Sequence, residues 1–174
     1  KITKDIFEIG IPSFLETLFT TFAGIIDSKM VSEMGVTAIS AVSVTNQPRL
    51  FIFSIFFALN TVTSSLTARY LGKKDRDMAN RILDTVLKLV IILSIVASIF
   101  SVALARPIMI AFANQKDTME SSILYFRIVM GGMIFNMVFM TINSALRGCG
   151  KTKITFVTNV VSCLVNIFFN YLLI

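Results

Sequence analysis

The chain has 174 residues, of which 55% are hydrophobic and only 15% are charged, and its formal net charge is +6. Soluble domains usually carry about a quarter of their residues as charges, so the composition excludes an ordinary soluble domain and favours a multi-span membrane protein. The sequence contains no histidine, the commonest general base and metal ligand, and we expect neither an enzyme nor a bound metal.

Five apolar segments are long enough to cross a bilayer as helices, which takes about 20 residues. They cover residues 6–30, 47–68, 85–105, 122–145 and 154–174. The second is expected to start with Asn46 as its cap and Pro48 in its first turn, where proline gives up no hydrogen bond. Arg106 and Pro107 are expected to stop the third, and the turn RGCGK stops the fourth. The predicted fold is therefore an all-α membrane protein with five transmembrane helices.

Lysine and arginine gather in the connections on one side of these helices. That side carries Lys1, Lys4, Arg69, Lys73, Lys74, Arg76, Arg81, Arg147, Lys151 and Lys153, and the other has only Lys29, Arg49, Arg106 and Lys116. Because basic connections stay in the cytoplasm, we expect a multi-pass protein of a bacterial plasma membrane with its amino terminus inside. The positive charge is expected to meet lipid headgroups rather than nucleic acid. Residues 73–83, KKDRDMANRIL, are predicted to form a short amphipathic helix on the inner surface.

Three smaller patterns have plain structural interpretations. The stretch ALRGCGKT, residues 145–152, imitates a phosphate-binding loop, but Ala145 stands where that pattern needs glycine and a membrane helix precedes it instead of a strand. Cys149 and Cys163 lack the spacing of a zinc site and are expected to be unpaired thiols. Four methionines lie along one side of the fourth segment, at residues 130, 133, 137 and 140. They either pack in the interior or form an adaptable wall for apolar ligands, and both interpretations stay open.

Polar residues inside two predicted helices fall on single stripes at a helical period. The first helix carries Pro12, Ser13, Glu16, Thr20, Ala23, Gly24 and Asp27 on its stripe, and the fifth carries Thr155, Asn159, Ser162, Cys163, Asn166 and Asn170. Such side chains face protein or water, because lipid accepts them poorly. A charge at mid-span costs at least about 2.5 kcal/mol, so Asp27 is expected to have a function. The asparagines could instead form interhelical hydrogen bonds worth about 0.6 kcal/mol each, and this alternative stays open.

Four stretches, in order and spacing, carry a resemblance to a known family: IIDSKMVSEMGVTAISAVSV, TARYLGKKDRDMANRIL, ALRGCGKTK and NIFFNYLLI. Together they resemble the amino-terminal half of multidrug and toxic compound extrusion transporters. The resemblance implies twelve helices in two lobes, with residues 1–174 forming a partial first lobe. The missing sixth helix and a carboxy-terminal lobe of the same protein would be its partners. It also implies an antiporter that expels amphipathic, often cationic compounds in exchange for protons or sodium, with no other cofactor.

The resemblance also assigns roles to residues. Asp27 matches an acidic residue that couples transport to the ion, Pro12 matches a proline where the first helix bends, and Asn166 matches an asparagine of the fifth helix. Tyr125 and Asn143 fall at cavity-lining positions, and Glu16 and Cys163 are expected to support the cavity from the polar stripes. Asn170 stands where many relatives have aspartate. One carboxylate then remains, and because desolvation favours its protonated form, a proton becomes a better candidate than sodium.

Two alternatives remain beside the antiporter. A lipid-linked saccharide flippase of the same architecture should line its cavity with several arginines for pyrophosphate, and here only Arg49 and Arg127 approach the outer half. A channel or a non-transporting membrane scaffold is the other alternative. A scaffold would have no use for the polar stripes, and a channel would move its solute without a counter-substrate.

Overall fold

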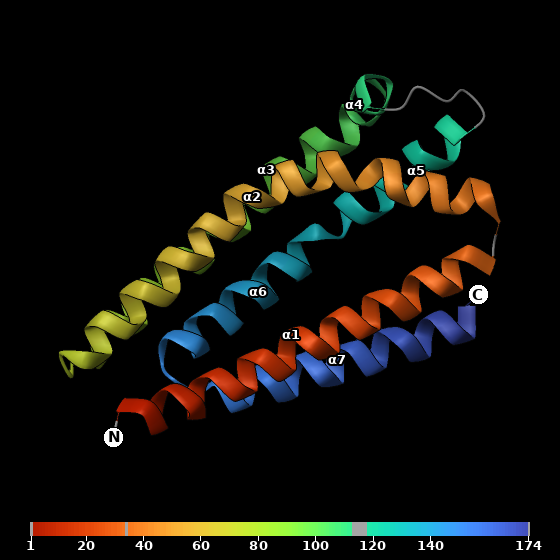
Figure 1. Ribbon diagram of the computed structural model, residues 1–174. Helices are drawn as coiled ribbons and strands as arrows, with labels where there is room; N and C mark the ends of the chain where they lie inside the picture. The colour runs from red at the N-terminus through yellow and green to blue at the C-terminus, as the bar shows by residue number, and fades with distance from the viewer. Residues whose placement is uncertain (1, 34, 113–117, 174) are drawn as a thin grey trace. The chain divides into compact units, whose positions relative to one another are not determined.

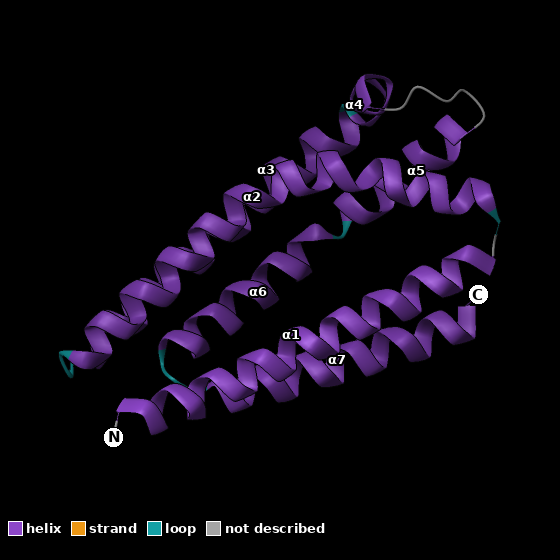
Figure 2. Ribbon diagram, in the orientation of Figure 1, coloured by secondary structure: helices purple, strands orange, loops and turns teal. Residues whose placement is uncertain are grey.

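The computed structural model describes residues 2–33, 35–112 and 118–173, and all the regular structure in these ranges is helical (Figure 1, Figure 2). The predicted all-α fold is confirmed. The chain divides into two compact units. One comprises Lys1–Gly35 and Gly150–Ile174, and the other comprises Val36–Cys149.

The first unit is a pair of long helices that lie side by side, α1 (Ile2–Glu33) and α7 (Thr152–Leu173) (Figure 1). Helix α7 contains neither glycine nor proline, so nothing interrupts its hydrogen bonds, and a continuous helix satisfies every backbone group that lipid would leave unpaired. Phe19 and Phe156 join the pair in an edge-to-face contact with ring centroids 5.9 Å apart. The two helices of this unit are therefore in direct contact along their lengths.

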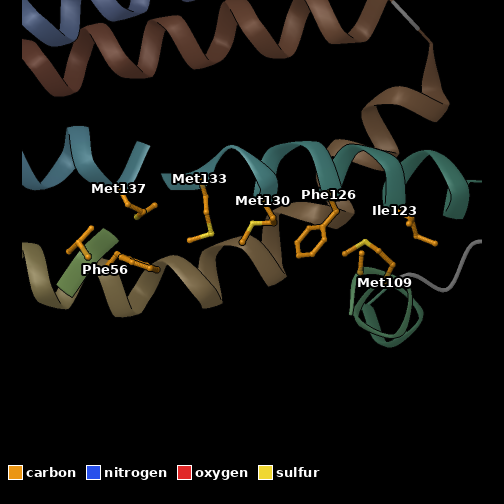
Figure 3. Packing of buried hydrophobic residues seen from close by; sticks show 9 residues of the cluster. Phe56, Met109, Ile123, Phe126, Met130, Met133 and Met137 are labelled. Carbon is orange, nitrogen blue, oxygen red and sulfur yellow. The ribbon is translucent and has the colours of Figure 1, made fainter. Parts of the chain in front are cut away.

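The second unit holds the helices α2 (Val36–Gly72), α3 (Arg76–Ala103), α4 (Ala105–Phe112), α5 (Met119–Gly131) and α6 (Met133–Gly148). Its hydrophobic core is built from Phe56, Val90, Ala105, Met109, Ile123, Phe126, Met130, Met133 and Met137 (Figure 3). Met130, Met133 and Met137 are at most 1% exposed. Three of the four striped methionines are therefore interior packing, whereas Met140 is only half-buried.

Three of the described helices are long and apolar enough to cross a membrane: α2, α3 and the Thr152–Leu172 part of α7. Helices α5 and α6 reach that length only as a pair, bent by 47°. The sequence predicts one helix over 122–145, but the structure has two that meet at Gly132. Gly131 and Gly132 lack side chains that would stiffen the backbone, so the bend falls there. Helix α6 ends at Gly148, in the predicted turn.

Helix α2 begins at Val36, and the predicted start at Asn46 is wrong. Pro48 lies inside α2, where it removes one backbone hydrogen bond. The Oδ1 of Asn46 accepts a hydrogen bond from Arg49 Nη2 at 2.6 Å instead of capping a helix. The helix continues because residues 36–46 contain no glycine or proline that would stop it.

The predicted surface helix in residues 73–83 is part of α3, so its prediction as a separate element is also wrong. Helix α3 begins after Asp75, whose side chain accepts a hydrogen bond from Met78 N at 3.0 Å and caps the helix. No glycine or proline follows before Ala103, where α3 ends. Pro107 does not stop α3, since it lies in the first turn of α4, where its missing N–H costs no hydrogen bond.

Helix α6 packs closely on α2. Thr141 Oγ1 donates to Asn60 Oδ1 at 2.9 Å, and the Ser144 hydroxyl donates to the Asn60 backbone carbonyl. A Cβ on Gly148 would lie 2.4 Å from the Ser64 carbonyl oxygen. Glycine is therefore required at residue 148 by the close approach of two backbones.

Candidate functional site

Asp27 of α1 meets Asn166 and Asn170 of α7, so the three residues to which the family resemblance assigns ion coupling lie together. Asn170 Nδ2 donates to Asp27 Oδ1 at 2.9 Å and lies 3.3 Å from Asn166 Oδ1. Asp27 and Asn170 are half-buried, and Asn166 is exposed. One carboxylate is thus held by two neutral amides.

The side-chain amide of Asn166 fits this cluster in two orientations. In one its Oδ1 faces Asp27 and accepts from Asn170. In the other its Nδ2 faces Asp27, 3.2 Å from Oδ1 and 3.1 Å from Oδ2. An ionised carboxylate can only accept hydrogen bonds, whereas a protonated one can also donate. The second orientation therefore gives the Asp27 carboxylate a second N–H donor.

Glu16 forms a second cluster with α7. Asn159 Nδ2 donates to Glu16 Oε1 at 2.6 Å, and Thr155 Oγ1 lies 3.5 Å from Oε2. Glu16 is 8% exposed and Thr155 is fully buried. The sequence places all three residues on the polar stripes but does not pair them.

The two clusters share one register between the helices. Asp27 and Asn170 are 143 residues apart in sequence, and so are Glu16 and Asn159. The constant offset means that α1 and α7 run parallel. Eleven residues separate the two acids and the two asparagines, which is about three helical turns. This common spacing is the signal by which the sequence could have paired Glu16 with Asn159.

The other predicted site residues are spread over both units. Cys163 lies on α7 between the two clusters, half-buried and unpaired. Pro12 lies within α1, and its side chain is outside the described part of the structure. Tyr125 of α5 is half-buried and Asn143 of α6 is 4% exposed; both belong to the second unit.

The second unit contains an open cavity of about 490 Å³ between α2 and α6, which the sequence did not indicate. Its lining consists of Phe57, Asn60, Thr61, Ser64, Ser65, Met140, Ser144 and Arg147. Asn143 precedes the lining residue Ser144 but is not itself part of the wall. Because Met140 is part of it, the stripe of methionines reaches from the core to this cavity.

The described residues include no group of three or more cysteine, aspartate or glutamate side chains that could hold a metal ion. The Asp27 cluster offers one carboxylate and two amides, and Asn170 turns its nitrogen, not its oxygen, toward the acid. Hard cations need several oxygen ligands directed at one point. The geometry observed is that of one carboxylate hydrogen-bonded to side-chain amides.

The family model MatE matches residues 12–172. Two similar curated proteins come from Bacillus subtilis (strain 168). The uncharacterized transporter YisQ is 23% identical over 172 residues, which is 99% of this chain and 38% of that protein. The probable multidrug resistance protein YoeA is 25% identical over 134 residues, which is 77% of this chain and 29% of that protein.

Two solved structures share the fold. One is a MOP superfamily transporter from Pyrococcus furiosus, and the other is an outward-facing multidrug resistance MATE family transporter of the MOP superfamily. Each superimposes with a TM-score of 0.90 and 23% identity over 96% of this chain and 37% of the other. The chain therefore spans less than two fifths of the length of these relatives.

Proposed function

The chain belongs to the MatE family of transporters, and on this premise we propose that it works as the amino-terminal lobe of an antiporter. The antiporter expels amphipathic, often cationic compounds from the cell in exchange for protons. Its other parts are a sixth helix and a carboxy-terminal lobe of the same protein. It lies in a bacterial plasma membrane with its amino terminus in the cytoplasm, an orientation supported by the basic connections.

The observation that carries the proposal is the contact of one carboxylate, Asp27, with two asparagines of α7. Asn166 and Asn170 are neutral, so they stabilise the charge of Asp27 by hydrogen bonds without cancelling it. An uncancelled negative charge within a membrane helix is costly, and it attracts a cation or a proton. Asp27 can therefore bind either a proton or a cationic substrate, but not both at once.

The hydrogen bonds around Asp27 favour a proton over sodium as the coupling ion. Sodium would need oxygen ligands, yet Asn170 presents Nδ2 to the carboxylate, and Asn166 does the same when Asp27 is ionised. To hold a metal ion both amides would have to turn around. A proton needs only the carboxyl group and a change in the orientation of Asn166.

The transport cycle follows from these two states of Asp27. Ionised Asp27 accepts hydrogen bonds from both asparagines and attracts a cationic substrate. Protonation removes the charge, and the new O–H group donates to Asn166 Oδ1. The substrate loses its electrostatic partner and leaves, while alternating access exposes the site to one side of the membrane at a time. Competition between proton and substrate makes the exchange obligatory.

Dye efflux from proteoliposomes containing the complete transporter tests the proposal. A pH gradient without sodium and a sodium gradient without a pH gradient are imposed in turn on wild type and on Asp27→Asn. We expect the wild type to respond to the pH gradient and Asp27→Asn to lose coupled efflux while it still inserts and folds, because the change removes a charge and little volume.

The matched control is Asp84→Asn, which removes an exposed carboxylate that pairs with Lys88 at 2.6 Å. It should transport like wild type, because exposed ion pairs contribute little. Wild-type efflux in Asp27→Asn would refute the coupling role. Efflux that follows sodium alone would refute proton coupling, and dye movement with no gradient at all would favour a channel.

A further inference from the structure

Arg49 places a permanent positive charge within α2, a helix long and apolar enough to cross the membrane. It lies in the first half of the helix, and its side chain is half-buried. A charged side chain in such a helix is costly and usually marks a functional site. The proton exchange proposed for Asp27 does not involve Arg49, so its charge calls for another explanation.

The guanidinium group heads a line of contacts along α2. Its Nη2 donates to Asn46 Oδ1 at 2.6 Å, and its central carbon lies 6.0 Å from the centroid of the Phe53 ring. Phe53 meets Phe57 edge to face, with ring centroids 6.4 Å apart. The four residues fall within about 80° of the helix circumference. One face of α2 therefore carries a polar, cationic end followed by about two turns of aromatic surface; we call it the Arg49 face.

The Arg49 face is directed along the bilayer normal in a definite sense. Side chains of a helix lean toward its amino terminus, and Arg49 does so, because it bonds to a residue three positions earlier. In the proposed orientation α2 starts on the outer side of the membrane. The guanidinium group therefore reaches toward the outer headgroups, and Phe53 and Phe57 lie deeper in the hydrocarbon.

The hydrogen bonds of Arg49 leave room for an anion. Asn46 and Phe53 are neutral, so neither balances the positive charge. Nε is buried without a hydrogen-bond partner within the described part of the chain, so these residues leave the group incompletely bonded. A guanidinium group has five N–H donors, of which Asn46 takes one. Enough remain for two parallel hydrogen bonds to the oxygens of a phosphate group.

The surface below the guanidinium group suits an acyl chain. Phe57 is 41% exposed and Leu50, on the same side of the helix, is 48% exposed, whereas Phe53 is half-buried between them. A headgroup phosphate on Arg49 would hold its acyl chains in the direction of these side chains. The Arg49 face thus matches both the charge and the apolar part of a phospholipid.

We propose that the Arg49 face binds one anionic phospholipid of the outer leaflet, with the phosphate on Arg49 and an acyl chain along Phe53 and Phe57. A zwitterionic lipid fits less well, because its own cation already balances the phosphate. The inference takes only the orientation of α2 from the proposed function and needs no proton exchange. Lipid binding and coupling at Asp27 can therefore fail independently.

Native mass spectrometry of the complete transporter in detergent, titrated with phosphatidylglycerol, tests the proposal. The wild type should bind one molecule of this lipid more tightly than phosphatidylcholine. Arg49→Gln should weaken that binding by about tenfold or more, because hydrogen bonds to a charged group are lost. Arg49→Lys should weaken it too, since an ammonium group lacks the planar fork. The control is Arg127→Gln, the same change at an exposed position of α5, which should keep the wild-type affinity.

Two further variants test the acyl-chain part of the site. Phe57→Ala should weaken phosphatidylglycerol binding. Phe51→Ala should not, because Phe51 is 77% exposed but lies about 200° around α2 from Arg49. Equal weakening by both variants would show general contact with lipid and overturn the proposed site.

The remaining outcomes decide between an anionic lipid and other occupants. Equal affinity of the wild type for phosphatidylglycerol and phosphatidylcholine would overturn the proposal without any variant. Unchanged affinity in Arg49→Gln would also overturn it, as expected if a carboxylate from the rest of the protein meets Arg49. Displacement of the lipid by an excess of inorganic phosphate would show a phosphate site and not a lipid site. If Asp27→Asn transports normally while Arg49→Gln loses the lipid, the proposed function fails and the lipid site stands.

Discussion

Replacing Gly148 with alanine should separate α6 from α2. The new Cβ would lie 2.4 Å from the Ser64 carbonyl oxygen and 3.1 Å from its Cα. Ordinary contacts are about 3.5 Å or longer, so the two backbones would have to part by about 1 Å. Moving either backbone costs free energy, because the clashing atoms belong to a helix backbone and not to a flexible side chain.

The size of the effect follows from two contributions. Overpacking a tight contact costs about 1–3 kcal/mol. Separation of the helices also stretches the two hydrogen bonds that Asn60 accepts from Thr141 and Ser144, and such bonds are worth about 0.6 kcal/mol each in membrane proteins. We therefore expect Gly148→Ala to lower the free energy of unfolding by about 2–4 kcal/mol.

Unfolding of the complete transporter in detergent, titrated with SDS and followed by circular dichroism, measures this loss. Gly72→Ala is the matched control, because a Cβ at residue 72 would meet nothing within 4 Å. It should leave stability unchanged or raise it slightly, since alanine favours a helix. If Gly148→Ala stays within about 0.5 kcal/mol of the wild type, the close approach of α6 to Ser64 does not exist.

Three further outcomes are expected. Asn170→Asp puts a second carboxylate beside Asp27 and should raise the affinity for sodium by at least about tenfold; sodium-dependent efflux measures this, and an unchanged dependence would contradict the ligand-number reasoning. Met133→Ala empties a buried position and should cost about 2–4 kcal/mol in the SDS titration, whereas Met140→Ala, at a half-buried position, should cost clearly less; equal losses would contradict this assignment of burial. Residues 1–174 alone should move no dye in proteoliposomes, because the second wall of the cavity is missing, and robust gradient-driven movement would show that one lobe suffices.

Local patterns in the sequence were enough to predict the class of the fold and the polar faces of two helices. A backbone in lipid must satisfy its own hydrogen bonds, so long apolar segments can only be helices. The period of a helix then places Glu16 and Asp27 on one face of α1, and Asn159, Asn166 and Asn170 on one face of α7. The fold class and the polar faces could be predicted because each depends on residues near one another in the sequence.

Several helix ends could not be predicted in this way, because signals for starting or stopping a helix are weak beside packing. Pro48 reads as a first-turn residue, but it is buried inside α2, in a helix that lies against α3 and α6. Asn46 reads as a cap, but its side chain bonds to Arg49. Gly131 and Gly132 permit a bend without requiring one, and the apolar core around Met130 and Met133 holds the two halves at 47°.

Only the tertiary structure decided which polar faces meet. Periodicity orients each helix about its own axis but contains no information on its neighbour, its direction or its register. The α1–α7 pair places Asn170 against Asp27 and Asn159 against Glu16 at one constant offset. A shift by a single residue would turn one helix by about 100° and separate every amide from its acid, so these bonds depend on the packing of the whole helix pair.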